Sequence, residues 1–196
     1  MKLIEDYRSY LSTLKVVSRD KNSQVSLIED ETKEHRLVNF DGVKKKLCKD
    51  FRGDALSSCD GYLNKGGVRY LIEFKNQAEG NIDKTIIKNK AYDSLSLLAM
   101  NENLTREELA GDTVLVIVYN NEKYVESNHS YQPSDSLDKL TMKLKRLSKK
   151  DELDQYPKKF DTRRYINQFY KNVYTIDIKV FKKKFMDILF SSTNIK

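Results

Sequence analysis

A short stretch of the chain holds four side chains whose types and spacing could perform hydrolysis. Asp60 lies before a Lys65-Gly66-Gly67 sequence, and Glu73, Lys75 and Gln77 follow it at intervals of two residues. Two carboxylates held close together repel each other and need a counter-charge. A divalent cation would supply that charge through oxygen ligands, and it would polarise a phosphate and lower the pKa of a bound water. The pattern therefore predicts a Mg²⁺ or Mn²⁺ site for phosphodiester hydrolysis, where Lys75 would stabilise the negative charge of the transition state.

The sequence around these residues predicts a β-hairpin that would bring them together. Residues 55–64 and 68–77 have the composition of two strands, and the glycine pair between them is typical of a tight turn. Successive side chains of a strand point to opposite faces. The polar side chains of the second strand would therefore share one face, which Asp60 can join if the register permits. The alternate residues of that strand are apolar and would bury against a helix: Val68, Tyr70, Ile72 and Phe74.

Hydrophobic periodicity predicts the elements on either side of this hairpin. Helices are expected over residues 2–17, within 30–51, from Asn81 or Asp83 to about Asn101, near 136–149, over 161–172 and over 181–190. Strands are expected over 113–119, a continuous apolar run typical of burial on both faces, and over 173–180. The order helix, strand, strand, helix, strand indicates an α/β fold in which a sheet packs between helices.

The length of the chain, 196 residues, suits a single domain over residues 1–196. The core of this domain is expected within residues 30–120. Residues 120–160 are polar, which predicts an insertion on the outside of the sheet. Residues 161–196 are predicted to form a basic helix-strand-helix addition at the C-terminus.

The residues of the hairpin also resemble the signature of a known family. Asp60 and, thirteen residues later, Glu73-Phe74-Lys75 resemble the D…(D/E)xK motif of the PD-(D/E)XK nuclease superfamily. The resemblance implies a restriction-endonuclease-like fold, a three-layer core of αβββαβ type with a mixed central sheet flanked by helices. It implies that Asp60, Glu73 and the Phe74 carbonyl are ligands of Mg²⁺ or Mn²⁺. It also implies that Lys75 is the catalytic lysine and that Gln77 orients water or phosphate.

Two features of the family correspond only in part to this sequence. Some members carry Gln-x-x-x-Tyr on the helix after the hairpin, and this chain has Lys88 and Tyr92 at that spacing. Lys88 could then bind a phosphate from the face that it shares with Tyr92. Many members also place a glutamate on the helix before the hairpin, as a further metal ligand. The candidates for that glutamate are Glu34, which lies three residues before Leu37, and its rivals Glu29 and Glu31.

Charge is unevenly distributed along the chain, whose net charge is +7. Residues 136–196 hold 16 lysines and arginines against 7 acidic residues, whereas residues 1–135 hold 20 against 22. A basic third joined to a nearly neutral body predicts a polyanionic partner, with nucleic acid first in line. DNA is favoured because most members of the superfamily act on DNA. The residues expected to contact it are Lys84, Lys88, Tyr92, Lys143, Lys145, Arg146, Arg163 and Arg164.

Composition excludes several other classes of protein. No stretch approaches the roughly 20 apolar residues of a membrane span, so no membrane partner is expected. Cys48 and Cys59 are too few for a disulfide scaffold or a zinc site. The first residues lack a secretory apolar segment. These features favour a cytoplasmic protein, and a homodimer remains open.

The same residues also fit three alternatives. Glu73 and Lys75 could be solvent-facing charges of an edge strand, where they would discourage aggregation. The chain could have a nuclease-like fold that no longer cuts and only holds nucleic acid or a protein partner. It could also be a structural or interaction protein, such as an immunity or assembly factor.

Overall fold

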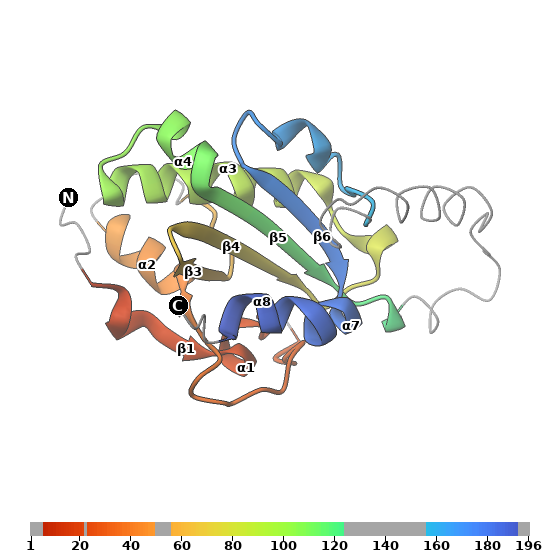
Figure 1. Ribbon diagram of the computed structural model, residues 1–196. Coiled ribbons are helices and arrows are strands. Elements are labelled where there is room, and N and C mark those ends of the chain that lie inside the picture. The colour runs from red at the N-terminus through yellow and green to blue at the C-terminus, as the bar shows by residue number, and fades with distance from the viewer. Residues whose placement is uncertain (1–5, 22, 50–55, 124–155, 192–196) are drawn as a thin grey trace.

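The computed structural model describes residues 6–21, 23–49, 56–123 and 156–191. In this part of the chain six strands form one sheet in chain order: β1 (Leu11–Thr13), β2 (Arg36–Asn39), β3 (Gly61–Lys65), β4 (Val68–Lys75), β5 (Thr113–Tyr119) and β6 (Asn172–Asp177). Strands β1 to β4 pair antiparallel, and β4, β5 and β6 pair parallel (Figure 1). The protein is therefore an α/β protein with a mixed open sheet.

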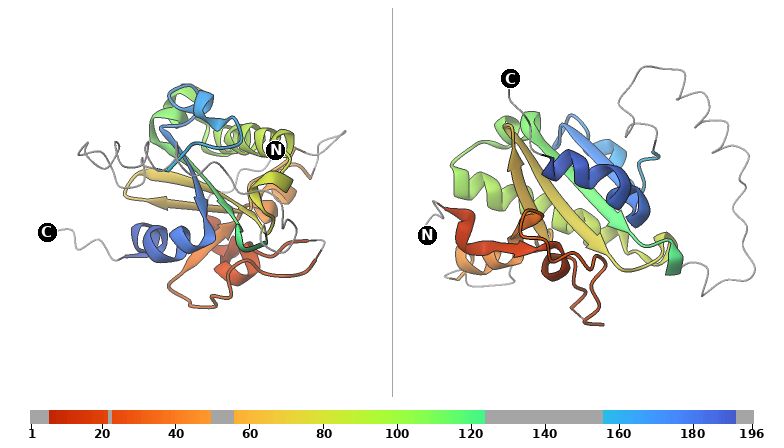
Figure 2. Two further views of the ribbon diagram at one scale, coloured as in Figure 1. Left: turned by 90° about the vertical axis from the view of Figure 1, so that its right-hand side faces the viewer. Right: turned by 60° about the horizontal axis from the view of Figure 1, so that its bottom comes forward.

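Helices cover both faces of this sheet. The helices of the described residues are α1 (Leu14–Val17), α2 (Phe40–Leu47), α3 (Lys84–Glu102), α4 (Arg106–Asp112), α7 (Ile178–Val180) and α8 (Met186–Phe190). A π-helical turn, Phe181–Phe185, joins the last two. Helices α2, α3 and α4 lie on one face, and α1 and the C-terminal helices lie on the other, as the views in Figure 2 show.

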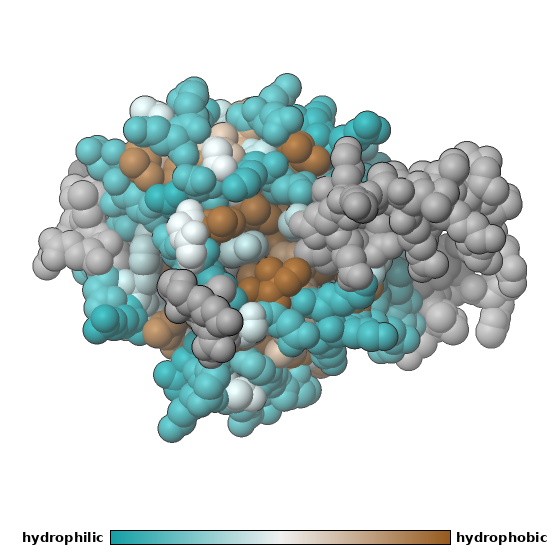
Figure 3. Space-filling model, viewed as in Figure 1, coloured by the Kyte–Doolittle hydropathy of each residue, from teal (hydrophilic) through white to brown (hydrophobic). Residues whose placement is uncertain are grey.

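The two faces of the sheet form two separate hydrophobic cores. Leu71 of β4 and Ile117 of β5 pack under α3, whereas Ile72 and Phe74 of β4 pack against Phe181 and its neighbours. Every residue of β5 is buried, so the prediction of a strand covered on both faces is confirmed. In Figure 3 hydrophobic surface is visible over the strands between the helical layers, while the outer surfaces of the helices are mostly hydrophilic.

The hairpin forms as the sequence predicts, although its first strand begins only at Gly61. Lys65 pairs with Val68, so the turn consists of Gly66 and Gly67, whose φ angles are 58° and 80°. Two consecutive residues with positive φ define the primed turn that matches the twist of antiparallel strands. The long helix after the hairpin is also confirmed, with Asp83 as its N-cap through a bond from the Thr85 N–H.

Three of the predicted helices differ from the structure. The segment 30–51 is helical only from Phe40, because residues 36–39 pair with β1 and β3, and Asn39 caps α2 by accepting from the Gly42 N–H. Residues 2–17 include a 3₁₀ turn, β1 and the short α1. The segment 161–172 holds only a 3₁₀ turn, Thr162–Tyr165, since Asn167 has a φ of 65° that a right-handed helix excludes. The helix expected near 136–149 lies outside the described residues.

The segment after residue 161 contributes a strand to the same sheet, because β6 pairs with β5 over its whole length. Every helix of the described residues is too short or too polar to cross a lipid bilayer.

Two glycine-to-alanine substitutions should change stability in opposite directions. Gly67→Ala would place a side chain on a left-handed residue of the turn, which costs roughly 1–2 kcal/mol. Gly111→Ala, in α4, meets nothing within 4 Å and should stabilise the protein by roughly 0.5–1 kcal/mol, because glycine weakens a helix. Urea denaturation of both variants checks this pair. Equal effects of the two substitutions would contradict the assigned turn.

Candidate active site

Asp60 and Glu73 lie close together on the face of the sheet that α3 covers. The regular pairing of β3 with β4 ends at Gly61, which pairs with Ile72, and the preceding Asp60 N–H also donates to the Ile72 carbonyl, at 3.0 Å. Lys90 of α3 contacts both carboxylates, which shows that they face the same helix. Leu71 is buried under α3, and Glu73 shares its face because side chains alternate along a strand. The structure thus brings together the two carboxylates that the sequence singles out.

Two ammonium groups neutralise this pair of carboxylates. Lys75 Nζ lies 2.9 Å from Glu73 Oε1, as the two-residue spacing predicts. Lys90 Nζ lies 2.7 Å and 2.9 Å from the two oxygens of Glu73 and 3.1 Å from Asp60 Oδ1. Lys90 reaches the site from α3, and the sequence analysis did not identify it. Its neighbours Lys88 and Tyr92 were chosen instead for their spacing.

Burial and charge together decide the protonation of the site. Glu73 is only 1% exposed. Burial and the nearby Glu73 charge raise the pKa of Asp60 to about 7, although Lys90 and the Phe74 N–H oppose this. Burial disfavours the charged form of Lys90, but Glu73 and Asp60 outweigh it and raise the pKa of this ammonium well above its usual value. Lys90 therefore remains protonated between the two carboxylates.

The oxygen atoms at this site fit a hard divalent cation. The Phe74 N–H donates to Asp60 Oδ2 at 2.8 Å, and the carbonyl of a strand residue points to the same side as its N–H. Two carboxylates and one carbonyl therefore converge here. Among the described residues no group of three or more His, Cys, Asp or Glu side chains could hold a metal. Mg²⁺ commonly takes one or two protein carboxylates and completes its shell with water and phosphate.

Gln77 and Glu34 are both exposed and lie outside the strands of the hairpin. Gln77 is exposed beyond the end of β4, and its carbonyl accepts the Asn120 N–H at 3.1 Å. Glu34 is exposed in the turn before β2, because the helix that was expected to carry it begins only at Phe40. The expectation that this helix extends back to Glu34 is therefore wrong, and α2 brings no glutamate to the site.

The helix before the hairpin instead brings Asp41 close to Asp60. Asp41 lies in the first turn of α2, and both carboxylates line a pocket of about 230 Å³. Asp41 accepts a hydrogen bond from Ser58 Oγ and forms ion pairs with Lys21 and Lys44. Burial opposes its charge, but these partners outweigh that effect and lower the pKa of Asp41 to about 2.

Known proteins do not identify this site. No family model, curated protein or solved structure matches the chain. The resemblance to the PD-(D/E)XK superfamily therefore remains an expectation based on the motif, and the function has to be argued from the geometry of these residues.

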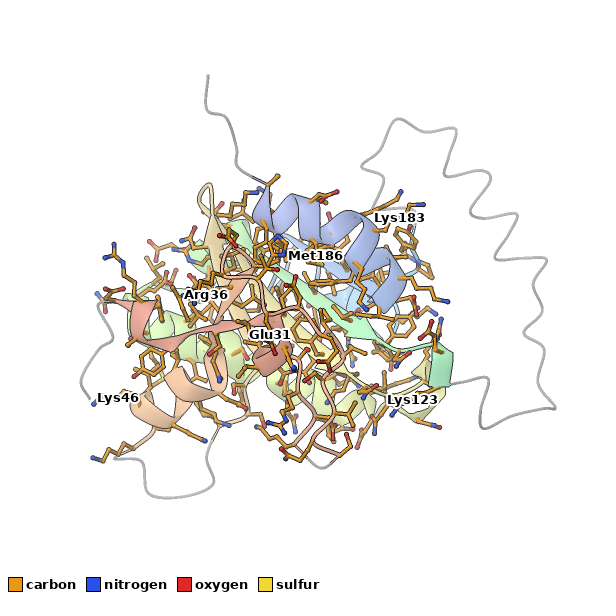
Figure 4. The ribbon with its side chains drawn as sticks, turned by 90° about the horizontal axis from the view of Figure 1, so that it is seen from below. Glu31, Arg36, Lys46, Lys123, Lys183 and Met186 are labelled. Carbon is orange, nitrogen blue, oxygen red and sulfur yellow. The ribbon has the colours of Figure 1, made fainter. Side chains whose placement is uncertain are left out.

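The residues predicted to contact nucleic acid occupy several surfaces. Lys84 lies 3.8 Å from Asp161, so the start of α3 adjoins the turn that carries Arg163 and Arg164, both of which are exposed. Lys88 is half-buried on α3. The remaining candidates, Lys143, Lys145 and Arg146, lie outside the described residues. Basic side chains also extend from both helical layers, as Lys46 and Lys183 do in Figure 4.

Tyr92 belongs to a row of aromatic rings with an arginine at each end. Its ring lies 5.6 Å from that of Phe169, which in turn lies 5.8 Å from Tyr165. Arg106 lies 4.5 Å above Tyr92, and Arg164 lies 5.8 Å from the centre of Tyr165. Tyr92 is 44% exposed. Two positions along a helix correspond to a rotation of about 200°, so this aromatic row faces away from Lys90 and the carboxylates.

The ion pairs of Asp41 should make stability depend on pH in the acidic range. The folded pKa of about 2 lies below the unfolded value of 3.8. The charged form therefore contributes stability above about pH 4, and this contribution is lost as the pH falls through the folded pKa. Because solvent screens the largely exposed Lys21, we expect the charge of Asp41 to contribute only about 1–2 kcal/mol to the free energy of unfolding.

Comparing the wild type with Asp41→Asn by urea denaturation at several pH values checks this expectation. Asparagine keeps the shape of the side chain but does not titrate. The difference in the free energy of unfolding between the two proteins should be constant near neutral pH and shrink between about pH 4 and pH 2. A difference that does not change with pH would contradict the role given to the charge of Asp41.

Proposed function

We propose that this protein is a metal-dependent nuclease of the PD-(D/E)XK type, which hydrolyses phosphodiester bonds, with DNA as the favoured substrate. The observation that carries the proposal is the convergence of Asp60, just before β3, and Glu73 of β4 around one ammonium group, with Lys75 in contact with Glu73. The order α1, β2, β3, β4, α3, β5, with α2 between β2 and β3, supports a restriction-endonuclease-like three-layer core of αβββαβ type. In this proposal residues 1–196 form one domain.

The proposed chemistry divides between the cation ligands and the lysine. Asp60, Glu73 and the Phe74 carbonyl would hold Mg²⁺ or Mn²⁺. The bound cation supplies polarisation of the phosphate and a lowered pKa of the attacking water. Lys75 is held beside Glu73, where its ammonium can contact a phosphate oxygen and stabilise the charge that develops there. Asp41 lines the pocket next to Asp60 and can orient water at its rim.

Nucleic acid is the polyanion proposed for the basic surface. The row of Tyr92, Phe169 and Tyr165 between two arginines offers ring faces for bases and cations for phosphates. Stacking of bases on aromatic side chains is a common mode of binding to single strands. Because this row faces away from Lys90, it would hold a strand at a distance from the carboxylates.

A second candidate is a nuclease-like module that binds nucleic acid without cutting it. The contacts of Lys90 favour this alternative, since its ammonium bridges Asp60 and Glu73 and balances their charges without a metal. In such a protein the hairpin would keep the family geometry, and the buried ion pairs would be structural.

Substitution of the hairpin residues tests the nuclease. Glu73→Gln and Lys75→Met should each lower cleavage of single- or double-stranded DNA with Mg²⁺ or Mn²⁺ by roughly 100-fold or more, because the first removes a charge that holds the cation and the second a charge that stabilises the reacting phosphate. Glu122→Gln, an exposed carboxylate paired with Lys179, serves as the matched control and should cleave as the wild type does. Cleavage is measured on labelled oligonucleotides, with EDTA as the blank.

The outcome separates the two candidates. Full activity in both hairpin variants would refute the assignment of Glu73 and Lys75. A wild type that binds oligonucleotides in EDTA but cleaves none with Mn²⁺ would favour the binding module.

The aromatic row makes a separate prediction about binding. Tyr92→Leu should weaken binding of a single-stranded oligonucleotide by roughly tenfold, because one stacking contact contributes about 1–3 kcal/mol. Fluorescence anisotropy in EDTA measures this without cleavage. Ile86→Ala, another exposed apolar residue of α3, is the control and should change affinity little. Equal affinities of the wild type and Tyr92→Leu would exclude the row as a binding surface.

A further inference from the structure

We propose that Lys90 is a built-in cation that fills the metal position between Asp60 and Glu73 and must leave it before a divalent cation can bind. The inference rests on the proposed function, because it concerns how the proposed metal site is loaded. It gives Lys90, which lies outside the hairpin motif, a defined part in that site.

The contacts of Lys90 show that its ammonium and a metal would compete for the same space. One nitrogen lies within 3.1 Å of three oxygens, two from Glu73 and one from Asp60. A divalent cation bound by these carboxylates would lie about 2.0–2.2 Å from its oxygens, inside the same arrangement. Lys90 Nζ and the cation therefore exclude each other.

Charge balance leads to the same conclusion. When both carboxylates are ionised, the ammonium groups of Lys75 and Lys90 balance them and the site is neutral. Adding a divalent cation with Lys90 in place would bring like charges together around the buried Glu73, where their repulsion is poorly screened. Departure of the Lys90 ammonium lowers the net charge of the loaded site from +2 to +1 and so relieves part of this repulsion.

The side chain of Lys90 can leave the site while the helix that carries it stays in place. Three contacts hold α3 against residues 57–59: the Ser57 N–H donates to Asp93 Oδ2 at 2.7 Å, the Cys59 N–H donates to Ser94 Oγ at 2.7 Å, and Cys59 Sγ lies 3.9 Å from the Lys90 carbonyl. The Lys90 side chain is 19% exposed, so it has a path to solvent. A lysine stem has four flexible carbons, and its ammonium is readily hydrated.

This arrangement has two measurable consequences. The metal-free protein should be stabilised by Lys90, because without it Asp60 loses the ammonium that lies 3.1 Å away and Glu73 keeps Lys75. The affinity for a divalent cation should be lowered by Lys90, because each binding event must break its hydrogen bonds to the carboxylates. Charge-assisted bonds of this kind correspond to roughly a ten- to hundredfold difference in the dissociation constant.

The experiment compares the wild type with Lys90→Met, which keeps the stem and removes the charge. Thermal unfolding in EDTA and titration calorimetry with MnCl₂ are measured on both proteins. Lys90→Met should unfold roughly 5–10 °C lower in EDTA and bind Mn²⁺ roughly ten- to hundredfold more tightly. Lys46→Met, which removes an exposed lysine of α2, is the control and should match the wild type in both measurements. If Lys90→Met does not fold, Lys90→Gln replaces it, since its amide can still donate to a carboxylate.

Each result has a distinct meaning. Tighter Mn²⁺ binding in the Lys90 variant supports the inference, whether or not the wild type binds the metal measurably. If the wild type binds Mn²⁺ and the variant binds it equally or more weakly, the inference fails while the proposed metal site stands. If neither protein binds millimolar Mn²⁺, the metal site itself is refuted, and the proposed nuclease and the inference fail together.

Discussion

The burial of one carboxylate, that of Glu73, is the constraint on which the site and much of the fold depend. An ionised group that is 1% exposed is costly unless charged partners and hydrogen bonds surround it. Lys75 comes from the same strand, but Lys90 can reach Glu73 only if α3 lies directly over β4. Asp93 and Ser94 hold α3 to residues 57–59, and the Tyr170 hydroxyl donates to the Ala91 carbonyl from the other side. The helix therefore has to dock accurately for the carboxylate to be tolerated.

The register of β4 decides which of its side chains face α3 and which face the second hydrophobic core. Glu73 sits on the α3 face of a strand whose opposite face, through Ile72 and Phe74, forms the second hydrophobic core. A shift of one residue in β4 would exchange these faces, burying the lysine and carboxylate in an apolar core. The tight turn at Gly66 and Gly67 fixes the register that prevents this.

Local patterns made part of this structure predictable from the sequence. The glycine pair, the apolar run of β5 and the contact of Lys75 with Glu73, two residues away on the same face, each depend on neighbours along the chain, and the structure contains all three features. Strand β2 was missed because Leu37 and Phe40 also fit a helical spacing, and only tertiary packing shows that Leu37 and Val38 enter opposite cores. Lys90 was missed because a lysine on a helix is usually solvated. Its role depends on what the helix covers.

The charges around the pocket are matched locally by ion pairs, whereas the chain as a whole carries an excess of positive charge. Asp41 is matched by Lys21 and Lys44, and Asp60 and Glu73 are matched by Lys75 and Lys90, so the site adds little to the net charge of +7. The excess positive charge therefore lies elsewhere on the chain and can attract a polyanion at long range. Under the proposed function, a phosphate near the carboxylates would meet lysines whose charges are already balanced. A divalent cation that replaced the Lys90 ammonium would carry two charges in place of one, so the site would become electropositive only with the cation bound. In that case attraction of the polyanion by the distant surface would come before binding at the site.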